Sequence, residues 1–60
     1  MNFKELVEKK NDLITRAEEV LNSAKTENRE LTDAEVEEIN GIKADVARID
    51  ETLKLDEEVR

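Results

Sequence analysis

The stretch Asn28-Arg29-Glu30-Leu31-Thr32-Asp33-Ala34-Glu35-Val36 contains the interruption that decides the fold of this chain. Thr32 and Glu35 have the spacing of a capping box, in which each side chain bonds the backbone N–H of the other residue. Leu31 and Val36 occupy the two hydrophobic-staple positions around that box. Acidic residues such as Asp33 favour the positive end of a helix. Together these features predict a helix that begins directly after Thr32.

The residues after this start repeat apolar side chains at three- and four-residue intervals. The repeat consists of Ile39, Ile42, Val46, Ile49 and Leu53. This spacing is typical of the seam by which one coiled-coil helix packs on another. It predicts a second helix over residues 33–58.

A wider apolar stripe precedes the interruption. Its members at helical spacing are Phe3, Leu6, Lys10, Leu13, Ala17, Val20 and Ala24. Val7, Ile14 and Leu21 each follow a member of this stripe and add a further column to it. Asn2 and Glu5 form a second capping-box-like pair at the start. The pattern predicts a first helix over residues 3–25.

One helix running through both stripes is excluded by their phase. Continuing the first register would place Leu31 and Glu38 on the buried face, whereas the second seam requires Ile39 there. Residues 26–31 would also have no buried face, and Asn28 suits the left-handed conformation that ends many helices. We therefore predict a loop over about residues 26–31. The whole chain, residues 1–60, is then one all-α antiparallel helical hairpin of coiled-coil type.

The predicted packing uses two separate faces of the hairpin. The contact between the helices is assigned to Leu6, Leu13, Ala17, Val20, Ile39, Ile42, Val46, Ile49 and Leu53. The spare column of Val7, Ile14 and Leu21 is expected to face a neighbouring copy, so we expect the hairpin to oligomerise through helix packing. Leu31, Thr32, Glu35 and Val36 are the predicted helix-cap residues.

Composition supports the need for a partner surface. The chain has 60 residues, of which 37% are hydrophobic and 45% charged, so it can bury little apolar area alone. Its net charge of -7 disfavours nucleic acid and anionic membranes as partners. No stretch approaches the roughly 20 apolar residues of a membrane span. We therefore expect neither nucleic acid nor membrane among its partners.

The residue types that carry most enzyme chemistry are missing. There is no histidine and no cysteine, and Ser23 falls on the polar side of the first helix, one turn from its end, which does not suggest a nucleophilic site. Neighbouring carboxylates such as Glu18 and Glu19 point about 100° apart on a helix, which favours a solvated acidic face over a metal site. We expect no enzyme activity, no metal and no cofactor.

Two positions have alternative interpretations. Gly41 permits close approach of a partner backbone or is a tolerated surface residue. Lys10, within the apolar stripe, disfavours tight symmetric packing or extends past Phe3 and Leu13 to solvent.

The segment from Asn28 to Glu35, followed by the apolar repeat, resembles the opening of tailed-bacteriophage major capsid proteins. The matching positions are Lys4, Glu5 and Leu6 in the first helix and Arg29, Leu31, Thr32 and Glu35 in the turn. The resemblance implies an N-terminal scaffolding (delta) domain that promotes procapsid assembly and is removed by proteolysis on maturation. It implies a shell domain downstream of residue 60, and a location in the bacterial host cytoplasm, inside the immature procapsid. Its implied partners are other copies of itself, capsid shell domains and a phage maturation protease.

A different class of function fits the same pattern. A free-standing coiled-coil adaptor or regulatory protein would capture a partner helix in its groove. Such an adaptor can stay monomeric until its partner arrives, whereas a scaffold segment is expected to associate with itself. Acidic mimicry of DNA ranks below both, because basic residues are interspersed among the acidic ones.

Overall fold

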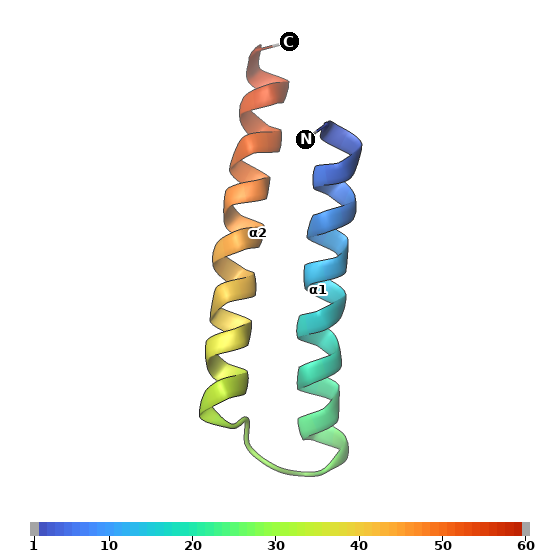
Figure 1. Cartoon of the computed structure of the whole chain (residues 1–60), viewed down its shortest axis with the longest axis vertical. Coiled ribbons are helices and arrows are strands. Elements are labelled where there is room, and N and C mark those ends of the chain that lie inside the picture. The colour runs from blue at the N-terminus through green and yellow to red at the C-terminus, as the bar shows by residue number, and fades with distance from the viewer. Residues whose placement is uncertain (1, 60) are drawn as a thin grey trace.

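The computed structural model describes residues 2–59, which form two long helices packed side by side (Figure 1). Helix α1 comprises Phe3–Thr26 and helix α2 comprises Asp33–Val59. They run in opposite directions, so both described ends of the chain lie at one end of the molecule and the loop lies at the other. The Cα atoms span 46 × 16 × 16 Å. The predicted all-α helical hairpin is confirmed.

The helix boundaries differ from the predicted ones by one residue each at their C-terminal ends. Helix α1 reaches Thr26 rather than residue 25, and α2 reaches Val59 rather than residue 58. The loop therefore covers residues 27–32 instead of 26–31. The backbone N–H of Glu27 still donates to the Ser23 carbonyl at 3.0 Å, which keeps Thr26 within the last helical turn.

Capping side chains fix where each helix begins. Asn2 Oδ1 accepts from the Glu5 N–H at 2.8 Å, and the Glu5 carboxylate accepts from the Asn2 N–H at 3.4 Å. The same reciprocal bonds join Thr32 and Glu35, at 3.1 and 2.9 Å. Both predicted capping boxes are therefore present, and α2 begins directly after Thr32 as the sequence indicated.

The end of α1 is a Schellman motif built on asparagine. The Arg29 N–H donates to the Ala24 carbonyl at 3.0 Å, and the Asn28 N–H donates to the Lys25 carbonyl at 3.1 Å. Asn28 has φ 51°, a left-handed conformation that asparagine tolerates better than most residues. This one residue turns the chain out of α1, as its type and position predicted.

The core is a narrow seam between the two helices. Its buried members are Val20, Ala24, Ile42 and Ile49. Within residues 2–59 no large side chain is fully enclosed, because two helices can cover each other on one side only. The hairpin thus has little of the buried apolar area that stabilises larger domains.

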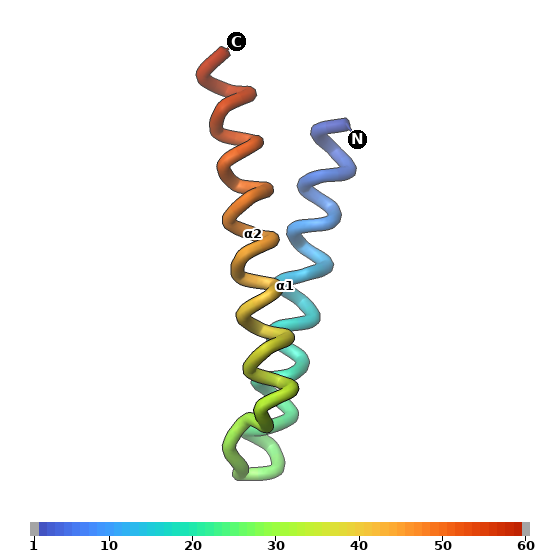
Figure 2. Tube along the Cα trace, turned by 60° about the vertical axis from the view of Figure 1, so that its left-hand side comes forward, coloured from blue at the N-terminus to red at the C-terminus, as the bar shows by residue number. Residues whose placement is uncertain are grey.

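Helix α2 extends beyond the start of α1, as Figures 1 and 2 both show. Near this end the Leu55 side chain is 50% exposed and Val59 is 87% exposed. Because the exposed side chains make few apolar contacts, the last turns of α2 are expected to open most readily.

Gly41 lies on the open surface of α2, so nothing within the hairpin requires a glycine there, and both interpretations of this position stay predictions. A Cβ atom built at this position has no neighbouring side-chain atom within 4 Å. Replacing Gly41 with alanine is expected to raise the free energy of unfolding by about 1 kcal/mol, because glycine loses more backbone freedom on forming a helix. Urea denaturation followed by circular dichroism would measure this gain.

The matched control is Ala44→Gly, at another exposed position in the middle of the same helix. This substitution should lower the free energy of unfolding by a similar amount. A Gly41→Ala variant less stable than the wild type would mean that another chain approaches α2 at this point.

Candidate functional site

An apolar groove runs along one side of the hairpin, between the two helices. It is lined by Ile14, Ala17, Glu18, Leu21, Ile42, Lys43, Val46, Ala47 and Asp50. Its volume is about 390 Å³, and most of its exposed wall is aliphatic. Ile14 is 38% exposed and Leu21 is 39% exposed, so neither is enclosed by the hairpin itself. We call this surface the apolar groove.

The opposite side of the hairpin is polar and crossed by ion pairs. A smaller recess of about 210 Å³ lies there, lined by Leu6, Lys9, Asp45, Arg48, Ile49 and Thr52. Arg16 of α1 reaches Glu38 of α2 with a nitrogen–oxygen distance of 3.3 Å. Asp45 and Arg48 form a further pair within α2. The two sides therefore differ in chemistry, because the groove side presents the exposed side chains of Ile14 and Leu21 and the other side presents ion pairs.

Lys10 closes the apolar groove toward the chain ends. Its ammonium lies 2.5 Å from the carboxylate of Asp50, a residue that lines the groove. Lys10 thus extends to Asp50 rather than to free solvent past Phe3 and Leu13, and its effect on symmetric packing stays a prediction. It ties α1 to α2, and the partly exposed setting of both side chains keeps the contribution of the pair modest.

One carboxylate, that of Glu35, has two tasks at the loop. Glu35 accepts two bonds from the Arg29 guanidinium, at 2.7 and 3.1 Å, while it also caps α2 through Thr32. The Arg29 bonds and the Thr32 N–H lower the pKa of Glu35 from 4.5 to about 2. The same contacts, Glu35 first and then Glu27, raise the pKa of Arg29. We call Arg29, Thr32 and Glu35 the loop lock.

Protonation of Glu35 is expected to release the loop lock. The pKa of Glu35 is lowered in the folded chain, so its stabilisation is complete above pH 4.5 and is lost as the pH falls toward 2. The variant Glu35→Gln should melt a few degrees below the wild type at pH 7, a modest difference because the group is exposed. The two melting temperatures should converge near pH 2.

Thermal melts of both proteins from pH 7 to pH 2, followed by circular dichroism, measure this difference. The comparison cancels the protonation of the other carboxylates, which both proteins share. A difference in melting temperature that stays constant down to pH 2 would show that Glu35 does not act through its charge.

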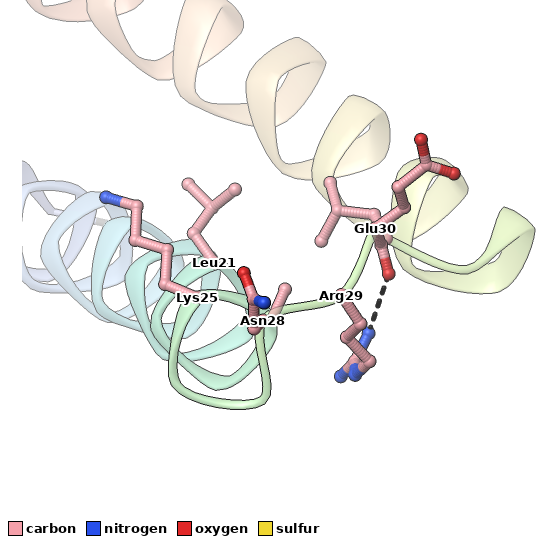
Figure 3. A pocket seen from close by; sticks show the side chains of 7 residues that line it. Leu21, Lys25, Asn28, Arg29 and Glu30 are labelled. Carbon is pink, nitrogen blue, oxygen red and sulfur yellow. Dashed lines mark hydrogen bonds between the residues drawn. The ribbon is translucent and has the colours of Figure 1, made fainter.

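A second recess lies beside the loop. It has a volume of about 520 Å³ and is lined by Leu21, Ala24, Lys25, Asn28, Arg29, Glu30 and Leu31. Figure 3 shows Leu21 and Lys25 rising on the same side of α1, with Arg29 directed to the other side of the loop. There the Arg29 guanidinium also donates to the Glu30 carbonyl at 3.1 Å. Leu21 lines both this recess and the apolar groove, so the two hollows are neighbours along α1.

The described residues offer little for catalysis or metal binding. Ser23 donates its hydroxyl to the Glu27 carboxylate at 2.9 Å, which makes it a contact of the helix end. Within residues 2–59 there is no group of three histidine, cysteine, aspartate or glutamate side chains placed to hold a metal ion.

The structure distributes the predicted residues over three environments. Of the predicted helix-contact residues, Val20, Ile42 and Ile49 are buried, and Leu6, Leu13, Ala17, Ile39, Val46 and Leu53 are half-buried. Of the predicted oligomer face, Ile14 and Leu21 line the apolar groove, while Val7 is half-buried. Of the predicted staple, Leu31 is half-buried and Val36 is 40% exposed.

Sequence reasoning missed the partners of three charged residues. The sequence did not lead us to predict the ion pairs of Lys10 with Asp50, of Arg16 with Glu38, or of Arg29 with Glu35. A usable signal existed for the first pair. In an antiparallel hairpin, residues at nearly equal distances from the loop face each other, and Lys10 and Asp50 satisfy that condition, whereas Arg16 and Glu38 do not.

Comparison with known protein families, characterised proteins and solved structures gives no match to this chain. Neither α1 nor α2, over the part of the chain that the structure describes, is long and apolar enough to cross a membrane.

Proposed function

We propose that this chain is the scaffolding segment of a phage major capsid protein, which promotes association of capsid subunits during procapsid assembly and is removed by proteolysis on maturation. The observation that carries the proposal is the apolar groove. Ile14 and Leu21 are exposed on it beside half-buried Val46, in a hairpin whose chemistry is otherwise limited to ion pairs. Such a surface suits helix-to-helix contact between proteins.

The residues that carry the resemblance to phage capsid proteins have a physical task here. Arg29, Thr32 and Glu35 form the loop lock, and Leu31 is half-buried within the loop. Together they fix the point at which the chain reverses, so the two helices meet in one register. A scaffold segment needs this property, because many copies must present the same face to one another.

The net negative charge of the chain is consistent with its proposed removal before DNA packaging. The chain has a net charge of -7, so many copies inside a shell would repel incoming DNA. Proteolytic removal of the segment before packaging relieves that repulsion. The proposed location is the bacterial host cytoplasm, inside the immature procapsid, with capsid shell domains and a maturation protease as partners.

The test begins with the gene from which the chain derives. We expect the reading frame to continue past residue 60 into several hundred residues of mixed α/β protein. A stop codon at that point would overturn the fused-scaffold proposal.

Particle assembly is the second stage of the test. The full-length protein should assemble closed particles in bacterial cells, and a version without residues 2–59 should assemble few or aberrant ones, as seen by electron microscopy. Equal assembly by both versions would contradict a scaffolding role. The version with Gly41→Ala, which leaves the groove and the loop lock unchanged, is the control for handling and expression.

The second candidate is a free-standing coiled-coil adaptor that binds a partner helix in the same groove. The observation in its favour is that the groove is aliphatic and bordered by charged residues, as grooves for amphipathic helices are. Sedimentation of the purified chain over a range of concentrations separates the two candidates. Self-association favours the scaffold, and a chain that stays monomeric favours the adaptor.

A further inference from the structure

We propose that the occupant of the apolar groove is a second copy of this chain, and that the two copies form a four-helix bundle with both loops at the same end. In this arrangement α1 of each copy packs on α2 of the other. The inference goes beyond the proposed function, which requires association but specifies neither the number of copies nor their orientation.

The first argument is the incompleteness of the core. Only four hydrophobic residues are buried among residues 2–59, and the groove leaves Ile14 and Leu21 more than one-third exposed. A second hairpin laid on the groove would convert a two-helix seam into the closed core of a four-helix bundle. Such closure stabilises a chain that is too short to bury enough apolar area alone.

The exposed apolar surface extends along the hairpin on the groove side. Phe3 precedes Ile14 by three helical turns and therefore shares its face of α1, and Val36 precedes Lys43 by two turns on α2. Phe3 is 44% exposed and Val36 is 40% exposed. The face available to a second copy therefore has nearly the full length of α1, which suits side-by-side packing of whole helices.

The second argument is the placement of two opposite charges on the groove. Glu18 borders it on α1 and Lys43 borders it on α2. Lys10 of α1 pairs with Asp50 of α2, and about two turns along each helix from that pair lie Glu18 and Lys43, at the same height. Within residues 2–59 neither of these two side chains takes part in an ion pair.

A symmetric dimer can bring these two charges together in two ways, which differ in the direction of the twofold axis. If the twofold axis runs parallel to the helices, α1 lies on the partner's α2 and Glu18 faces the partner's Lys43. The symmetric contact repeats the pair, so two opposite-charge contacts form at the middle of the interface.

If the twofold axis runs across the helices instead, α1 lies on the partner's α1. Glu18 lies at the middle of the α1 lining, and Lys43 lies at the same height on α2, near the loop end of its lining. An axis that crosses the groove at this height places Glu18 against the partner's Glu18 and Lys43 against the partner's Lys43. Two like-charge contacts replace the two favourable ones. The charges therefore select the parallel axis, in which the loops lie at the same end.

Charge reversal tests the pairing. The variants Glu18→Lys and Lys43→Glu should each raise the dimer dissociation constant about tenfold, since each places like charges at both symmetric contacts. The double variant restores opposite charges and should return to within about threefold of the wild type. Glu37→Lys, which changes the net charge as Glu18→Lys does but lies outside the groove lining, should leave dimerisation nearly unchanged.

Sedimentation equilibrium at several concentrations gives these constants. Single reversals that leave the dissociation constant unchanged would overturn the pairing of Glu18 with the partner's Lys43. A chain that stays monomeric at millimolar concentration, or that forms only larger assemblies, would overturn the dimer itself. A chain that forms only larger assemblies would overturn the dimer and leave the scaffold proposal standing, whereas a monomeric chain would count against both. Particle assembly by the full-length protein tests the proposed function separately.

A distance between the two loops tests the orientation directly. The chain contains no cysteine, so Glu30→Cys provides one labelling site on the loop. Spin labels on the two copies should lie within about 25 Å of each other, because helices in a bundle are spaced about 8–10 Å apart. Loops at opposite ends would separate the labels by about the 46 Å length of the hairpin, and that distance would overturn the proposed orientation.

Discussion

Replacing Ile49 with alanine is expected to lower the free energy of unfolding by about 2–5 kcal/mol, the range measured when large aliphatic side chains are truncated in protein cores. Ile49 is only 6% exposed and lies in the seam between α1 and α2. For a domain of 60 residues the total stability is roughly 3–9 kcal/mol, so this one change should leave much of the protein unfolded.

Urea denaturation at fixed protein concentration, followed by circular dichroism, measures the effect of Ile49→Ala. The control is Leu55→Ala on the same helix, where the side chain is 50% exposed and the expected loss is below about 1 kcal/mol. Equal losses for the two variants would show that the seam of α2 does not pack on α1 in solution.

The double substitution Ile14→Glu and Leu21→Glu is expected to abolish self-association and leave the helix content largely intact. Both side chains are exposed on the hairpin, so the new carboxylates stay in water in the monomer. In an assembly closed over the groove they would be buried without partners, which is strongly unfavourable. We expect the dissociation constant to rise more than 100-fold.

Sedimentation and circular dichroism of the same sample separate the two parts of this expectation. The control is Leu55→Glu with Val59→Glu, which adds the same charge at exposed apolar positions outside the groove lining. An oligomer that survives Ile14→Glu and Leu21→Glu would mean that the groove is not the contact surface. Loss of helix content would mean that the two residues belong to the core of the hairpin.

The elements that sequence could predict are those set by near neighbours in the chain. The capping boxes of Asn2 with Glu5 and of Thr32 with Glu35 each need only a three-residue spacing, and both are present. The left-handed turn at Asn28 depends on the character of one residue. Because these signals are local, they fixed the two helix starts and the place of the reversal.

What sequence did not predict depends on contacts made after the chain has folded back. The pairing of Lys10 with Asp50 requires the relative height of two helices, which no local pattern contains. The double use of Glu35, as a cap and as the partner of Arg29, requires the path of the loop. The groove itself was predicted only as an apolar column on the first helix, without its α2 wall of Val46 and Ala47.

The placement of both described chain ends at one end of the hairpin has a mechanical consequence. Between Lys43 and Val59, α2 rises about 24 Å at 1.5 Å per residue. In the proposed capsid subunit, a hairpin anchored at its Val59 end would hold its groove at about that height above the attachment. Two grooves could then meet only where their anchors lie a suitable distance apart, and tethering would make even a weak contact sufficient. Contact between two hairpins would therefore depend on the distance between neighbouring subunits.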